Sequence, residues 1–179
     1  MSLDIRWLAP AALIALAPGQ CIAKRYMSFE QAQGLIFAAA DEFVAAPVKL
    51  SIEQAQLIEK LSGVKSRRLE QQVWQARAKG KFIGWFILDE VIGKHELITY
   101  AAGIKPDGTL RQFQIIEYRE LYGFQVQDLK WRDQFVGKTI RDPLQVRVDI
   151  ANITGATMSS EHVTEGLKRL LFLHHVVLR

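Results

Sequence analysis

Hydrophobic and polar positions divide the first third of the chain into an apolar N-terminal stretch and two helical segments. Residues 29–43 are rich in alanine and contain few helix breakers, and Pro47 follows, which predicts a helix over 29–43. Ser51 and Gln54 have the spacing of a capping box and predict a second helix, which reaches about Leu61 and ends at Ser62-Gly63. Both segments are apolar along one side, so we expect them to cover a sheet.

From Val73 the pattern changes to short runs rich in β-branched and aromatic residues. These runs cover residues 73–76, 82–91, 97–104 and 110–118. The connections are too short for crossover helices, so the strands should form antiparallel hairpins. A last helix is predicted over 160–173, with one apolar face formed by Val163, Leu167, Leu170 and Leu171. The fold class is therefore α+β: an antiparallel meander flanked by helices, with a C-terminal helix.

The apolar stretch from Trp7 to Pro18 is too short to span a bilayer as a helix, which needs about 20 residues. Its position after Arg6 and before small residues is typical of a secretory signal peptide. We expect cleavage after Ala23, which would also remove Cys21. A buried or interfacial N-terminal helix is the alternative. The expected division is 1–23 as signal peptide, 24–70 as an N-terminal helical segment, and 71–179 as the main domain.

Charge and composition exclude several functions. The 179 residues include 23 Lys and Arg against 19 Asp and Glu, a net charge of +4, and the basic residues are dispersed, so no nucleic-acid partner is expected. The single cysteine cannot form an internal disulfide, and no zinc or haem spacing occurs. His174-His175 has no third ligand in view, so no metal site is expected.

The most informative segment is Thr154-Gly155-Ala156-Thr157, followed by Met158, Ser159 and Ser160, at the start of the last helix. Small residues let the backbone approach a ligand, and free N–H groups at a helix N-terminus favour a phosphate. The alternative is that these Thr and Ser residues are ordinary helix N-caps. The long connection 119–146 is a second candidate, because loops of this length tend to carry function.

Four short motifs occur in order between about Val73 and Leu171. They are a Gly-x-x-x-x-Gly hairpin at 103–108, Glu120 with Gly123, a Phe-x-Gly-Lys element at 135–138, and Thr-Gly-Ala-Thr at 154–157. Together they resemble the FMN-binding domains found in peripheral flavoprotein subunits of Rnf and sodium-pumping quinone oxidoreductase complexes. The resemblance makes 71–179 the expected FMN-binding domain.

The resemblance implies that Thr157 carries FMN as a phosphoester, installed by a flavin transferase that uses FAD and Mg²⁺. Tyr122 and Trp131 are candidates for stacking on the isoalloxazine ring, and Glu120 is expected to accept hydrogen bonds. The expected cofactor-binding residues are Thr157, Thr154, Gly155, Ala156, Ser159, Ser160, Glu120, Tyr122, Gly123 and Trp131. No catalytic residue is assigned.

Two positions depart from the family pattern. Ala151 stands where the family's transferase-recognition pattern has Asp, with Asp149 and Asn152 as the nearest polar substitutes, and Leu121-Tyr122 replaces Thr-Pro.

Three function hypotheses follow. The first is an exported, periplasmic or extracytoplasmic flavoprotein that carries electrons between membrane and extracytoplasmic redox partners, rather than a stand-alone enzyme. The second is a flavin-free binding or scaffold module with the same fold. A small flavin reductase is the third.

Overall fold

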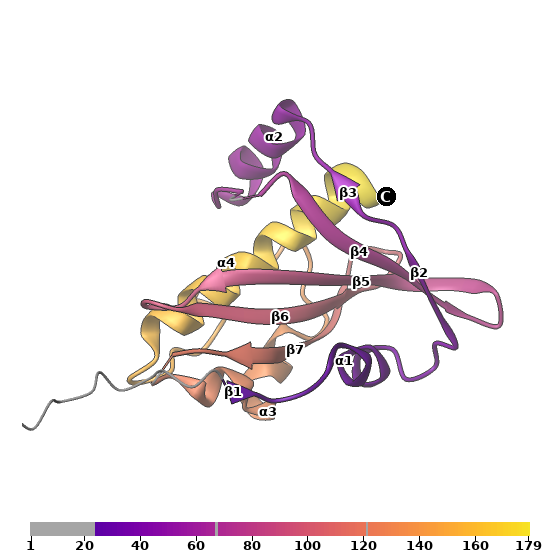
Figure 1. Ribbon diagram of the computed structural model, residues 1–179. Coiled ribbons are helices and arrows are strands. Elements are labelled where there is room, and N and C mark those ends of the chain that lie inside the picture. Colours follow the sequence, from indigo (N-terminus) through magenta and orange to yellow (C-terminus); the bar gives the residue numbers. More distant parts are fainter. Residues whose placement is uncertain (1–23, 67, 121) are drawn as a thin grey trace, which may run out of the picture.

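An antiparallel sheet of seven strands forms the centre of the computed structural model, which describes residues 24–66, 68–120 and 122–179 (Figure 1). The strand order is β1-β7-β6-β5-β4-β2, and β3 pairs with β4. This arrangement confirms the α+β class and the antiparallel meander. The strands are β1 (Lys24–Arg25), β2 (Glu42–Ala45), β3 (Val48–Lys49), β4 (Glu70–Ala78), β5 (Lys81–Ile92), β6 (Leu97–Ile104) and β7 (Leu110–Tyr118).

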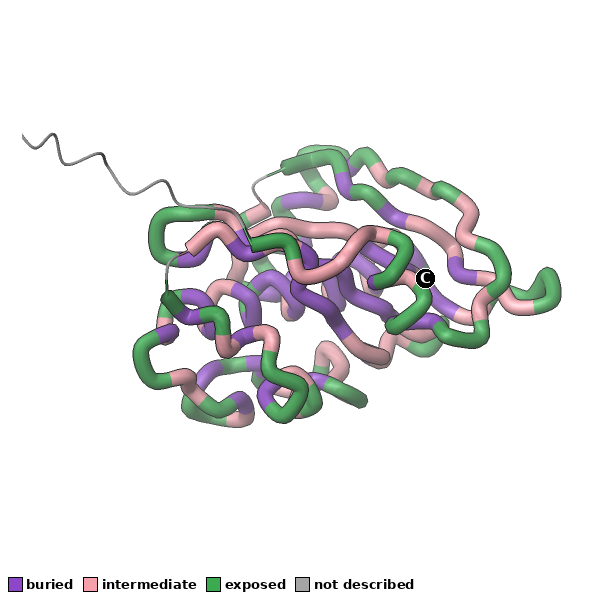
Figure 2. The backbone as a smooth tube through the Cα atoms, turned by 60° about the horizontal axis from the view of Figure 1, so that its bottom comes forward, coloured by how far each residue is buried: buried purple, intermediate pink, exposed green. Residues whose placement is uncertain are grey.

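Helices cover both faces of this sheet. Successive strand residues alternate between the two faces, so that Ile87 joins the core under the C-terminal helix while Phe86 joins a smaller cluster under the first helix. Figure 2 shows the buried positions gathered in the interior of the molecule, with exposed positions around them. The helical elements are α1 (Phe29–Ile36), α2 (Ile52–Ser62), η1 (Phe124–Gln127), α3 (Leu129–Arg132), η2 (Asp133–Phe135), α4 (Thr157–Leu173) and η3 (His174–Leu178).

Local signals predicted α2 and the hairpins correctly. The Ser51 hydroxyl accepts from the Gln54 N–H at 3.2 Å, Gln54 Oε1 accepts from the Ser51 N–H at 2.9 Å, and Gly63 ends the helix in the left-handed conformation. In the β6–β7 turn, Asp107 Oδ1 accepts from the Thr109 N–H at 2.9 Å. The capping box and the turn therefore form as their sequences indicate.

The predicted helix over 29–43 is wrong beyond Ile36. Phe37 leaves the helix with φ −127°, and residues 42–45 form β2, which pairs with β4. The Phe37 ring fills space at Gly84, where a Cβ atom would lie 2.8 Å from it, so tertiary packing overrides the helical preference of the alanine run. The 24–70 segment thus supplies three strands as well as two helices, and the predicted division at residue 70 crosses one continuous sheet.

The C-terminal helix begins three residues earlier than the predicted 160–173, at Thr157. Its predicted apolar face is buried in the main core, as Val163, Leu167, Leu170 and Leu171 all show. None of the helices in the described part of the chain is long and apolar enough to cross a membrane. The predicted signal peptide, residues 1–23, lies outside the described residues.

Leu170 is completely buried. Leu170→Ala should therefore lower the free energy of unfolding by about 2–5 kcal/mol, because the variant loses apolar contacts and leaves a cavity. Urea melts check this. Leu35→Ala is the matched control, because Leu35 is 54% exposed on α1 and should cost about 0.5 kcal/mol or less. Equal melting curves for the two variants would contradict the packing of α4.

Candidate flavin-attachment site at the start of α4

The Thr-Gly-Ala-Thr segment leads directly into α4 without a side-chain cap. Ala156 occupies the N-cap position, and no side chain in the described part of the chain caps the helix. The Ser160 N–H is bonded to the Ala156 carbonyl at 2.9 Å, so the N–H groups of residues 157–159 face the open end of the helix. The alternative that Thr or Ser forms an ordinary N-cap here is therefore wrong.

Exposure separates the small residues of this segment into two groups. Thr154 and Gly155 are exposed and Thr157 is half-buried, so these three are open to a ligand. Ser159 and Ser160 are buried, and the Ser160 hydroxyl donates to the Thr157 carbonyl at 2.9 Å. Ser160 therefore belongs to the interior, contrary to its assignment as a cofactor-binding residue.

Gly123 brings the long connection against the first turn of α4. A Cβ atom at Gly123 would lie 2.9 Å from Ala156 Cβ and 3.2 Å from Ser159 Oγ, and its φ is 90°. The structure thus places Gly123, Ala156 and Ser159 together at the first turn of α4, with Ala156 and Ser159 buried. Tyr118, at the end of β7, also reaches this contact through its hydroxyl. Its role has no sequence signal beyond a tyrosine in a strand.

The two aromatic candidates lie in different environments. Tyr122 is 79% exposed, which leaves its ring open to stacking. Trp131 is only 6% exposed and packs edge-on against Phe113 and Phe135, so it offers no open face for a flavin ring. Its indole N–H instead donates to the Ala151 carbonyl at 2.8 Å. The stacking role expected for Trp131 is corrected to support of the backbone that precedes Thr157.

Glu120 accepts hydrogen bonds, as expected, but from the turn between β5 and β6. Its Oε1 accepts from the backbone N–H groups of His95 and Glu96. Partial burial acts to raise the pKa of Glu120, but these backbone hydrogen bonds outweigh it and lower the pKa. Glu120 therefore binds the hairpin turn as a carboxylate.

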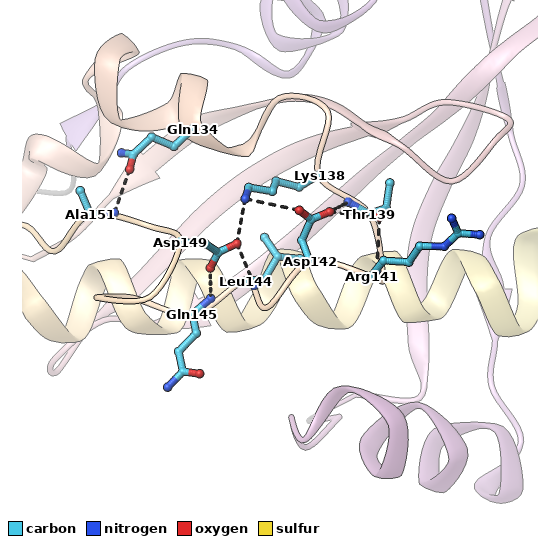
Figure 3. A network of polar contacts seen from close by, with 9 residues as sticks. All are labelled: Gln134, Lys138, Thr139, Arg141, Asp142, Leu144, Gln145, Asp149 and Ala151. Atoms are coloured by element: carbon cyan, nitrogen blue, oxygen red, sulfur yellow. Dashed lines mark hydrogen bonds and ion pairs between the residues drawn. The ribbon is translucent and has the colours of Figure 1, made fainter.

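A polar network holds the loop that leads into the segment (Figure 3). Lys138 Nζ lies 2.8 Å from Asp149 Oδ2, and Asp149 Oδ1 accepts from the Gln145 N–H at 2.8 Å. Asp149 Oδ2 also accepts from the N–H of Leu144, which has a positive φ of 45°. Gln134 Oε1 then accepts from the Ala151 N–H at 2.8 Å. The carboxylate and the amide fix the backbone on the way to Thr157.

Charge pairing within this network shifts two pKa values in opposite directions. The hydrogen bond to Asp149 raises the pKa of Lys138. For Asp149, partial burial acts to raise the pKa, but Lys138 and the two backbone N–H groups lower it.

The segment lies at the surface rather than in an enclosed cavity. A cavity of about 370 Å³ is lined by residues further along α4, including His162 and Arg169, and by Asp89. Residues 154–157 do not line it. Among the described residues, no three His, Cys, Asp or Glu side chains gather as a metal-binding group.

Asp149→Asn should lower the free energy of unfolding at neutral pH by about 1–3 kcal/mol, because it removes a charged partner from Lys138. The folded-state pKa of Asp149 is lowered, so its contribution is fully present above the reference value of 3.8 and is lost as the pH falls through the folded-state pKa. Urea unfolding of both proteins at neutral pH and below pH 3.8 should show the difference shrinking in acid. Glu165→Gln is the control, because Glu165 is exposed. If the loss of unfolding free energy in Asp149→Asn were the same at both pH values, the ion pair with Lys138 would be contradicted.

Comparison with known proteins gives a family match that includes the Thr-Gly-Ala-Thr segment. The FMN-binding domain family model matches residues 93–171, from the end of β5 to α4. A component of the proton-translocating ferredoxin:NAD(+) oxidoreductase complex of Clostridium ljungdahlii is 30% identical over 130 residues, covering 68% of this chain and 66% of that protein. The match thus spans just under two thirds of the length of this relative.

The fold has a solved counterpart in NqrC of Shewanella oneidensis. The TM-score is 0.50 at 16% sequence identity, and the match covers 79% of this chain and 73% of NqrC. At this identity the likeness concerns the fold, and it agrees with the α+β architecture described above. Residues 93–171, which include the long connection, the loop before α4 and the Thr-Gly-Ala-Thr segment, match the FMN-binding domain family.

Proposed function

We propose that FMN is joined to the Thr157 hydroxyl through a phosphoester and that the domain carries electrons. The observation that carries this proposal is the start of α4 at Thr157 with an uncapped N-terminus, directly after the exposed Thr154 and Gly155. Free N–H groups and the positive end of the helix dipole stabilise a phosphate at this position. The residues present therefore fit the group: Thr154, Gly155 and Thr157 would hold the phosphate, and Tyr122 is open to the ring.

Attachment requires a second protein. A threonine hydroxyl is a weak nucleophile unless a base or a metal activates it. The Thr157 carbonyl accepts a hydrogen bond from the Ser160 hydroxyl. Among the described residues, no side chain that could act as a base is hydrogen-bonded to the Thr157 hydroxyl. A flavin transferase that uses FAD and Mg²⁺, as the family resemblance implies, would supply both the base and the metal.

Electron transfer to a membrane-side partner is the role we infer for the loaded domain. FMN accepts and releases one or two electrons, and the protein contributes position and electrostatics. Thr157 is half-buried, its neighbour Met158 is exposed, and Tyr122 on the long connection is exposed as well, which allows a partner to approach closely. The relative from Clostridium ljungdahlii belongs to a ferredoxin:NAD(+) oxidoreductase complex, which supports redox partners in a membrane complex.

Export is the second part of the proposal. Lys24 pairs with Tyr118 at the end of β7, so the described chain enters the fold beside the candidate site (Figure 1). Cleavage after Ala23 would leave β1 and the 2.9 Å bond from the Tyr26 N–H to the Ile116 carbonyl intact. A periplasmic or extracytoplasmic location is therefore compatible with a complete sheet.

The mature protein should begin at Lys24. N-terminal sequencing of protein from the native host, with cell fractionation, checks this expectation. Recovery of Met1 or Ser2 would contradict cleavage and would make a retained anchor the better interpretation.

A flavin-free binding module is the second candidate, and one observation favours it. Ala151 replaces the family's acidic residue, and neither polar neighbour can substitute for it freely. Asp149 is occupied by Lys138 and two backbone N–H groups, and Asn152 is an amide without the negative charge of an aspartate. If transferases require a carboxylate at this point, the unaltered chain is a poor substrate.

Ala151→Asp should therefore raise the rate of FMN incorporation by a flavin transferase. The Ala151 side chain is exposed and its backbone is held by Trp131 and Gln134, so the substitution should leave the loop in place. Ala151→Asn is the matched control, because it has the same shape without the charge. Equal rates for Asp and Asn would show that the missing carboxylate does not limit attachment.

Coexpression with a flavin transferase should add one FMN that survives denaturation, measured by intact mass and in-gel fluorescence. Thr157→Ala should abolish it and Thr157→Ser should keep part, because the hydroxyl is the acceptor. Thr154→Ala should weaken incorporation less, since Thr154 has only a supporting contact with the phosphate. Denaturation-resistant flavin in Thr157→Ala would place the acceptor elsewhere, and a wild type without flavin would favour the flavin-free module.

A further inference from the structure

The hydroxyl of Tyr118 joins two segments that meet beside Thr157. Tyr118 is 2% exposed, and its Oη lies 2.5 Å from the Tyr122 carbonyl oxygen and 2.9 Å from Ser159 Oγ. A carbonyl can only accept, and a phenol has one proton, so Tyr118 donates to Tyr122 and accepts from Ser159. Burial raises the pKa of Tyr118, which keeps the proton in place at neutral pH.

Gly123 makes the close approach of these groups possible. A Cβ atom there would lie 2.6 Å from Tyr118 Oη, closer than such atoms can approach without a shift. The left-handed φ of 90° also favours glycine. The Tyr122–Gly123 segment is therefore shaped to receive the phenol.

Each partner of the phenol has a defined relation to the site. Ser159 is buried in the first turn of α4, two residues after Thr157. Tyr118 itself is held in the sheet, where it pairs with Ile98 of β6 and Lys24 of β1. The Tyr118 hydroxyl thus links the sheet to the first turn of α4, which carries Thr157.

We propose that Tyr118 is a positioning residue of the attachment site. Its hydroxyl holds the Tyr122–Gly123 segment and the first turn of α4 in one arrangement, which sets where the Thr157 hydroxyl lies when a transferase acts. We call Tyr118, Tyr122, Gly123 and Ser159 the Tyr118 clamp. The consequence for attachment rests on the proposed function, whereas the clamp is a property of the unmodified chain.

The test compares Tyr118→Phe and Ser159→Ala with a matched control in the full chain. Tyr100→Phe is the control, because the Tyr100 hydroxyl is also buried, donates to Asp89 Oδ2 at 2.5 Å and lies against Gly166 further along α4. Amide hydrogen exchange of the unmodified proteins is followed at the bonded N–H groups next to the two segments, which are those of Val126 and Asp128 after Gly123 and that of Ser160 in the first turn of α4. Transfer of FMN from FAD by a transferase, followed against protein concentration, separates kcat from KM for each variant.

In Tyr118→Phe, we expect exchange in both segments to accelerate by about tenfold, the scale of one lost buried hydrogen bond. The kcat of flavin transfer should fall by about tenfold or more with little change in KM, because misplacement of a reacting group acts on the transfer step. Ser159→Ala should accelerate exchange mainly in the turn of α4, since the bond from Tyr118 to Tyr122 remains. Tyr100→Phe should lower overall stability without either effect.

Unchanged exchange at both segments in Tyr118→Phe would overturn the clamp. Faster exchange with the same kcat as Tyr100→Phe would overturn the positioning role and leave Tyr118 as a folding contact. A wild type that takes up no FMN would refute attachment at Thr157, and the exchange comparison would then decide the clamp by itself.

Discussion

The packing of α4 across β5 and β6 is the contact on which the candidate site depends, because α4 carries Thr157. Gly166 allows the helix to lie directly against the Tyr100 hydroxyl and Val91, where any larger residue would collide. Next to this contact, Arg169 Nη2 lies 2.6 Å from Asp89 Oδ2, with both side chains about nine-tenths buried. Removal of either partner would leave a buried charge, which is strongly destabilising. These contacts hold the middle of α4 on the sheet, and the first turn at Thr157 is contacted separately by Tyr118 and Gly123.

The loop before α4 is held through its backbone, which separates the fold from the chemistry of the site. Gln134 and Trp131 bind the two backbone polar groups of Ala151, and Asp149 binds the loop before it. The side chains of Ala151, Thr154 and Thr157 contribute none of these bonds. A family departure such as Ala151 is thus compatible with an unchanged loop, because its consequences fall on recognition by other molecules and not on folding.

The sequence predicted the structural features that depend on residues close together in the chain. The predictions were wrong where contacts between residues far apart in the chain determine the structure. The capping box at Ser51, the hairpin turns and the apolar face of α4 are local patterns, and all three are confirmed. The helix expected over 29–43 ends early because Phe37 fills space at Gly84, a contact between residues far apart in the chain. In the site, the start of α4 near Thr157 could be predicted, but the burial of Trp131 and Ser160 could not, because their partners come from other elements.

Under the proposed attachment, the covalent bond solves a conflict between exposure and retention. A carrier needs its flavin near the surface, and the segment around Thr157 lies outside the cavity lined by Arg169 and His162. The helix N-terminus stabilises a phosphate by only about 0.3–1 kcal/mol, whereas micromolar binding requires about 8 kcal/mol. A surface site of this kind would release free FMN unless the ring were extensively buried. A phosphoester to Thr157 retains the cofactor without burial, which leaves the ring accessible to a redox partner.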